Sequence, residues 1–163
     1  MRHYLVLLAL ALPGRQDLQE PPPTSRPAAL AVIVHKDSEV TDLKLEELRA
    51  IVTMERQFWS AGHRIQLLLR PSKCEEMQTL LQRVYRMAED ELRRMWVQKL
   101  FEGRIPAVPT TVKLGAKAVA TVEQSPNAIS FVPLNEVTAN VRVLSIDGKK
   151  PGEAGYPLTA GGK

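Results

Sequence analysis

Three side chains that can hold a small oxyanion stand within four residues of one another. Arg70, Ser72 and Lys73 bring a guanidinium, a hydroxyl and an ammonium group to the point where an apolar segment ends. Arginine can hold an oxyanion through two parallel hydrogen bonds, and a serine hydroxyl can donate one more. In α/β sheets, ligands collect beyond the carboxyl ends of strands. The sequence therefore predicts an oxyanion site with Arg70 and Ser72 as ligands.

The same residues have a second interpretation as the start of a helix. Ser72 and Glu75 have the Ser-x-x-Glu spacing of a capping box, in which the serine accepts from the backbone N–H of Glu75. Glu75 and Glu76 would also stabilise the first turn through the helix dipole and would repel an incoming anion. Both interpretations, helix capping and oxyanion binding, stay open from the residues alone.

Other chemistries lack a recognisable motif. His3, His35 and His63 stand far apart without ligand-like spacing, and Cys74, the single cysteine, rules out an internal disulfide and a thiolate cluster. The sequence contains no GxGxxG motif, no P-loop and no GxSxG motif. We expect no metal, no cofactor and no enzymatic activity.

The net charge of +4 on 163 residues does not indicate a nucleic-acid partner. The basic residues of the predicted helices alternate with acidic ones, namely Arg83, Arg86, Arg93 and Arg94 with Glu89, Asp90 and Glu91. Such alternation is typical of a solvated helix face rather than of a stripe that binds a phosphate backbone. We expect no nucleic-acid binding.

The elements that position these residues follow from hydrophobic periodicity. Residues 29–34 form an apolar, partly β-branched run of strand length, which is typical of a strand covered on both faces. From Leu43 onward, apolar residues at Leu45, Leu48, Ile51 and Val52 lay one stripe along a helix. We expect this helix to pack back on the strand.

The rest of the chain continues to alternate strands and helices. We predict strands at 64–69, 128–132 and 140–146, and helices at 72–87, 89–101 and 113–123. In the second of these helices Leu92, Trp96 and Leu100 share one stripe, so Trp96 is expected in the core rather than as a ligand platform. Strands separated by helices imply an α/β fold with a mixed, largely parallel sheet flanked by helices.

The order of these segments resembles that of the phosphate-type periplasmic solute-binding proteins of ABC transporters. The shared succession is an apolar strand, His35-Lys36-Asp37-x-x-Val40, Leu43-x-Leu45-Glu46-x-Leu48-Arg49-x-Ile51 and Phe58-Trp59. It continues with Arg70, with Leu100-Phe101-x-Gly103 and with Ser125-Pro126-Asn127-Ala128-Ile129-Ser130-Phe131-Val132. The resemblance covers about residues 28–146 and implies one lobe of a type 2 periplasmic binding protein.

This resemblance implies a protein that binds phosphate or a similar oxyanion in the cell envelope. Its partners would be an ABC permease and a second lobe, supplied by a partner protein or a homodimer, because the chain has length for about one lobe. It also implies Asp37 and Ser38 as ligand-binding residues, although turn formation explains them equally well. The alternative is a non-enzymatic envelope interaction module that kept the lobe but lost the ligand. The missing Gly-Ser-Gly-Thr of the family favours this alternative, and Arg70 favours binding.

The sequence also allows predictions for the two ends of the chain. Residues 1–12 have the order of a secretory signal, a basic start and a short apolar stretch, with an N-terminal strand or a start-site artefact as alternatives. Residues 13–27 are a Pro-rich linker, 28–147 the α/β domain and 148–163 a flexible tail. We expect a periplasmic or secreted protein without membrane insertion after signal removal.

Overall fold

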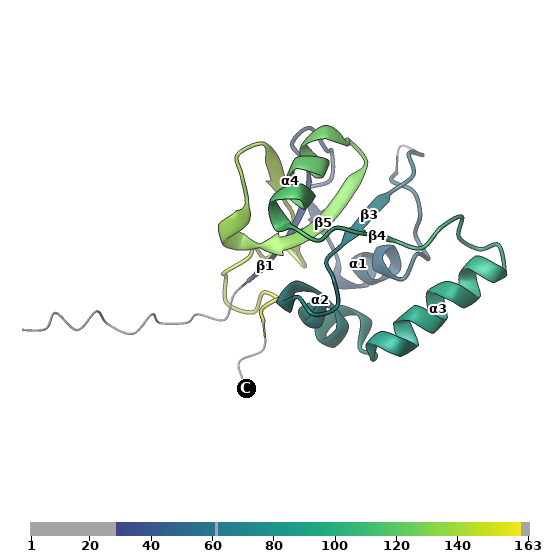
Figure 1. Cartoon of the computed structure of the whole chain (residues 1–163). Helices are drawn as coiled ribbons and strands as arrows, with labels where there is room; N and C mark the ends of the chain where they lie inside the picture. Colours follow the sequence, from purple (N-terminus) through teal and green to yellow (C-terminus); the bar gives the residue numbers. More distant parts are fainter. Residues whose placement is uncertain (1–28, 61, 161–163) are drawn as a thin grey trace, which may run out of the picture.

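The structure is a computed structural model that describes residues 29–60 and 62–160, so the expected signal and linker lie outside the described residues. A five-stranded sheet with the order β4-β3-β5-β1-β6 organises the chain (Figure 1). Its strands are β1 (Leu30–His35), β3 (Gln66–Leu69), β4 (Thr110–Thr111), β5 (Ala128–Pro133) and β6 (Val141–Val143). A second sheet pairs β2 (Asp42–Leu43) with β7 (Ser145–Ile146).

Four strands of the large sheet run in one direction and β1 runs against them. β3 is parallel to both β4 and β5, whereas β1 is antiparallel to both β5 and β6. The prediction of a mixed, largely parallel sheet is confirmed. The reversal of β1 matters for the functional site, because the residues that follow β1 and β3 leave the sheet at opposite ends.

Helices cover both faces of this sheet. They are α1 (Leu45–Val52), α2 (Glu75–Leu80), α3 (Glu89–Phe101) and α4 (Gly115–Gln124), and a π-helical turn, Leu81–Tyr85, extends α2. Side chains alternate along β1: Val32 and Val34 belong to the core cluster under α1 and α2, and Ala31 and Ile33 to the cluster under α4 (Figure 1). Successive side chains of β1 point to opposite faces, and both faces are covered, so β1 is apolar throughout.

Helix α3 lies at the side of the molecule, beyond α1 and α2 (Figure 1). Its bounds agree with the predicted 89–101, and the carboxylate of Glu91 accepts from the backbone N–H of Ala88 at 2.9 Å, which stabilises the helix start. Leu92 is buried in the main core. The nearly buried ammonium of Lys99 donates to the carbonyl of Thr53 at 2.6 Å and so ties α3 to the end of α1.

The expected helix 72–87 begins later than the sequence suggested. Residues 71–74 form a turn in which the N–H of Cys74 donates to the carbonyl of Pro71 at 2.9 Å, and the helix starts at Glu75 with Cys74 as its N-cap. Ser72 therefore lies outside the helix, and the expected capping box with Glu75 is absent. The helical region ends at Tyr85, because Arg86 adopts a left-handed conformation with φ of 53°.

The predicted strand 140–146 is two short strands. β6 pairs with β1 in the large sheet, and after Leu144 the chain joins the small sheet as β7 beside β2. The side chain of Leu144 is fully buried at this crossing point. The sequence has one continuous run here, so its pattern does not indicate the change of sheet.

The C-terminal segment is part of the fold as far as it is described. Tyr156 and Leu158 are buried in the main core, the hydroxyl of Tyr156 donates to the carbonyl of Leu30 at 2.8 Å, and the N–H of Leu30 donates to the carbonyl of Leu158 at 2.9 Å. The expectation that residues 148–163 form a tail outside the domain does not agree with this packing. Within residues 29–60 and 62–160, every helix is too short or too polar to cross a bilayer.

Candidate functional site

The four residues predicted to bind ligand lie at opposite ends of the large sheet. Arg70 and Ser72 follow the carboxyl end of β3, whereas Asp37 and Ser38 follow the carboxyl end of the reversed strand β1. The register fixes this separation, because the last residues of β1 pair with the beginning of β5, next to the beginning of β3. The structure brings Arg70 and Ser72 together and places Asp37 and Ser38 elsewhere.

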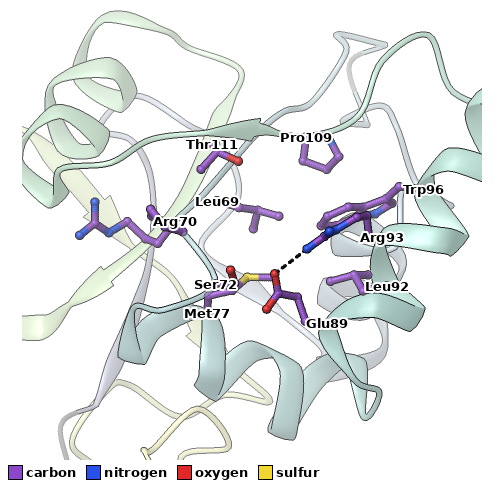
Figure 2. Close-up of a pocket in the computed structure, with 11 residues that line it drawn as sticks. Leu69, Arg70, Ser72, Met77, Glu89, Leu92, Arg93, Trp96, Pro109 and Thr111 are labelled. Atoms are coloured by element: carbon purple, nitrogen blue, oxygen red, sulfur yellow. Dashed lines mark hydrogen bonds and ion pairs between the residues drawn. The ribbon is translucent and has the colours of Figure 1, made fainter.

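A cavity of about 310 Å³ lies at the carboxyl ends of β3 and β4 (Figure 2). The turn after β3, helix α2, helix α3 and the segment that enters β4 surround it. Its lining residues are Leu69, Arg70, Pro71, Ser72, Met77, Glu89, Leu92, Arg93, Trp96, Pro109 and Thr111. Both residues of the predicted oxyanion site therefore border one cavity.

The guanidinium of Arg70 nevertheless points away from this cavity (Figure 2). Its Nε donates to Oε1 of Glu76 at 3.2 Å and its Nη1 donates to the carbonyl of Val112 at 3.0 Å. The side chains of Arg70 and Glu76 are only 10% and 9% exposed. In this arrangement Arg70 joins the end of β3 to α2 and to the segment after β4, and its charge is compensated within the protein.

Ser72 is the second predicted ligand, and its side chain is available. The hydroxyl makes no hydrogen bond to another residue in the described part of the chain, whereas its backbone carbonyl accepts from Nε2 of Gln78 at 2.6 Å. Thr111, the last residue of β4, brings another hydroxyl to the cavity. The two hydroxyls are donors that suit an oxygen-rich solute.

Helix α3 supplies an ion pair that borders this cavity, and neither of its residues is among the predicted ligands. Nη2 of Arg93 donates to Oε1 of Glu89 at 3.0 Å, and Figure 2 shows this ion pair at the cavity. The pair has the i,i+4 spacing of an ordinary solvated helix face, which is how the sequence analysis interpreted it. Glu89, Leu92, Arg93 and Trp96 share one helix face at spacings of three and four, and this stripe is the signal that could have identified them.

Trp96 contacts both the core and the cavity. Its ring packs edge-to-face on Tyr85 with the ring centroids 6.1 Å apart and the planes at 80°. The indole Nε1 is buried and has no hydrogen-bond partner among the described residues. Buried N–H groups are rarely left unpaired. The expected core position of Trp96 thus describes one side of the ring, and the other side borders the cavity.

Asp37 and Ser38 border a different cavity, of about 430 Å³, together with Trp59, His63 and Asn127. Local hydrogen bonds hold this loop. Oγ of Ser38 accepts from the N–H of Val40 at 3.3 Å, and the N–H of Asp37 donates to Nδ1 of His35 at 3.2 Å. Such bonds are typical of turns. In the described part of the chain, no three His, Cys, Asp or Glu side chains cluster in a way that could hold a metal ion.

The class that fold and cavity define is one lobe of a periplasmic-binding-protein-like fold, with the cavity beyond the carboxyl ends of parallel strands. Solved phosphate-type proteins share the fold. A protein described as a phosphate ABC transporter substrate-binding protein, from Clostridium perfringens and with bound phosphate, matches with a TM-score of 0.62 at 18% identity, over 76% of this chain and 46% of that one.

Two further solved structures share this fold. An ABC-type phosphate transport receptor from Vibrio cholerae has a TM-score of 0.62 at 16% identity, over 76% of this chain and 48% of that one. PstS from Borrelia burgdorferi has a TM-score of 0.60 at 18% identity, over 76% and 49%. This chain thus spans about half the length of the structures that it matches. No protein-family model and no curated protein matches the sequence. The resemblance seen in the sequence is confirmed as a shared fold.

Proposed function

We propose that this domain is a solute-binding domain that takes phosphate or a similar small oxyanion in the cavity at the carboxyl ends of β3 and β4. The observation that carries the proposal is the convergence of Ser72, Thr111 and Arg93 on one cavity in that position. Hydroxyl and guanidinium groups are the donors that oxyanions require. The fold similarity to a protein with bound phosphate supports the same class of solute.

Arg70 has a supporting part in this proposal. Its guanidinium holds the turn that carries Ser72 by bonding Glu76 and the carbonyl of Val112, so it positions the site while Arg93 faces the solute. Asp37 and Ser38, at the other end of the sheet, are outside the proposed site. We further propose an envelope location, an ABC permease as partner, and a second lobe from a partner protein or from a second copy to enclose the solute.

Titration calorimetry and thermal unfolding of the whole chain, with phosphate beside sulfate, test the proposal. A solute that binds only the folded state raises stability by mass action, by about 2.7 kcal/mol at a concentration of 100 times Kd. Ser72→Ala and Arg93→Ala should each weaken the effect. Arg94→Ala is the matched control, because Arg94 forms the same kind of i,i+4 pair, with Asp90, and does not border the cavity.

A second candidate function, a non-enzymatic interaction module of the cell envelope, rests on a specific observation. The Arg70 guanidinium, which the sequence marks for the oxyanion, is paired internally with Glu76. Helix α3 also exposes apolar side chains, with Phe101 85% exposed. An absence of any stabilisation at millimolar phosphate or sulfate would reject a site for these two free oxyanions and favour this second function.

A further inference from the structure

We propose that the solute of this cavity is an organic anion, an oxyanionic headgroup attached to an apolar or aromatic body, and that Arg93 and Trp96 recognise its two ends. This inference rests on the proposed solute-binding function and names the chemical class of its solute. It differs from the binding of bare phosphate, which has no apolar part. The size, the walls and the charge balance of the cavity each support it.

The size of the cavity exceeds what a bare phosphate fills. Its volume of about 310 Å³ lies at the lower end of the range, about 300–1,000 Å³, of pockets that hold small organic ligands. Such pockets are mostly apolar, with a few polar groups that orient the ligand. A headgroup bound to Arg93 and Ser72 would leave the remaining volume for an attached group.

The walls of this volume are largely apolar. Leu69 from β3, Met77 from α2 and Leu92 from α3 lie along the cavity together with the indole of Trp96 (Figure 2). Inorganic phosphate offers these side chains nothing to pack against. Leu69, Met77 and Leu92 are already buried and shape the wall. The indole of Trp96, in contrast, is partly exposed, so an aromatic body can pack on it.

The charge balance leaves little electrostatic attraction for a bare anion. Arg93 brings one positive charge, but Glu89, which lies beside it and borders the same cavity, brings one negative charge. A headgroup must compete with Glu89 for the guanidinium. Arg93 is 70% exposed and has N–H donors besides the one that Glu89 uses, so it can bind both. Electrostatic attraction alone is therefore weak, and apolar contacts must add to the affinity.

The buried N–H of Trp96 is an independent observation that points to a ligand. It has no acceptor among the described residues, and indole nitrogen can only donate. An unpaired buried donor is costly, and this cost is recovered when an acceptor reaches it. Because the ring borders the cavity, we assign an oxygen of the solute as the acceptor of this N–H.

The experiment is a calorimetric titration of the whole chain with three probes: inorganic phosphate, phenyl phosphate and benzyl alcohol. We expect phenyl phosphate to bind at least tenfold more tightly than either of the others. Arg93→Ala should weaken phenyl phosphate at least tenfold, and Arg93→Lys, which keeps the charge without the planar fork, should recover part of this loss. Arg94→Ala should change nothing, because Arg94 has similar exposure and the same kind of ion pair away from the cavity.

Trp96→Phe separates the two roles of the indole. The phenyl ring keeps an aromatic wall but removes the N–H, so phenyl phosphate should bind several-fold more weakly while thermal unfolding of the free protein changes little. This substitution also avoids the core cavity that alanine would create beside Tyr85.

The outcomes separate a failure of this proposal from a failure of the proposed solute-binding function. If inorganic phosphate binds as tightly as phenyl phosphate, the oxyanion site stands and the organic solute is rejected. If benzyl alcohol binds as tightly as phenyl phosphate, the anionic headgroup is rejected. Equal losses in Arg93→Ala and Arg94→Ala would reject the assignment to this cavity. If none of the three probes binds, the solute-binding function itself fails.

Discussion

Nε of Arg70 donates to Oε1 of Glu76 at 3.2 Å, so the arginine that the sequence marks for an oxyanion is paired with a carboxylate of the following helix. Both side chains are almost fully buried. The carboxylate of Glu76 thus stands where an oxyanion would meet the guanidinium. The pair makes the turn that carries Ser72 rigid, and it leaves Arg93 as the cation that the cavity presents.

Glu76→Gln should destabilise the free protein and make it more responsive to oxyanions. The substitution leaves the charge of Arg70 buried without its partner, and breaking a buried pair in this way costs about 3–5 kcal/mol. A phosphate ion that reaches the released guanidinium would recover part of this free energy. Urea unfolding with and without phosphate should therefore show a larger phosphate effect in Glu76→Gln than in the wild type.

Glu75→Gln is the matched control for this prediction. Glu75 precedes Glu76 on α2, but it is exposed. Its substitution should change the free energy of unfolding by less than about 0.5 kcal/mol. Equal free energies for Glu76→Gln and the wild type would show that the Arg70–Glu76 pair does not hold the turn.

Lys99→Met should loosen helix α3 and weaken solute binding without touching the cavity. The ammonium of Lys99 donates to the carbonyl of Thr53 at 2.6 Å, and this carbonyl would lose its partner at a cost of about 1–3 kcal/mol. Because α3 carries Arg93 and Trp96, its loosening should also lower the affinity for phenyl phosphate. Gln98→Met, at the exposed neighbouring position, should leave both the urea midpoint and the affinity near wild type.

Stability should fall as the pH rises above about 10. Burial raises the pKa of the Tyr85 hydroxyl and the pKa of the Tyr156 hydroxyl. In the unfolded chain tyrosine ionises near pH 10, whereas the folded protein keeps these protons. Above that pH, ionisation therefore lowers the free energy of the unfolded state and destabilises the fold. The contribution is fully present below pH 10 and is lost as the pH rises toward the folded-state pKa.

Tyr156→Phe separates this effect from the titration of lysines. At pH 7 the variant should lose about 1 kcal/mol, because the hydrogen bond to the carbonyl of Leu30 is gone. Between pH 9 and 11 that deficit should shrink, since phenylalanine has no proton to lose. Urea unfolding of both proteins across this range measures the difference, and a constant deficit would contradict the assigned role of burial.

Local patterns were enough to predict most elements of the fold. The bounds of α3 and the run that became β1 followed from apolar spacing, because both segments bury side chains with the period of their own secondary structure. The burial of Tyr156 and Leu158 was not predictable in the same way. These residues stand in a segment rich in glycine and proline, and only their contact with the distant β1 shows that they belong to the core.

Predicting the site in full required information on tertiary structure, which local sequence patterns do not contain. Periodicity identified β1 as a strand but not its direction in the sheet, and this direction moves Asp37 and Ser38 to the end opposite Arg70. The start of α2 at Glu75 instead of Ser72 likewise decided that Glu76 reaches Arg70. Arg93 shares the helix face of Leu92 and Trp96, but only the docking of α3 on the core places this face at the cavity.

Glu89→Gln should strengthen the binding of an organic anion. The substitution removes the negative charge that competes for Arg93, while glutamine keeps a similar size. Exposed ion pairs contribute up to about 1 kcal/mol, so the affinity for phenyl phosphate should rise roughly two- to fivefold. Asp90→Asn removes the equivalent carboxylate from the Arg94 pair and should leave the affinity unchanged. An equal gain in both variants would indicate a general effect of charge on α3, whereas a gain confined to Glu89→Gln requires that the anion lie beside Arg93.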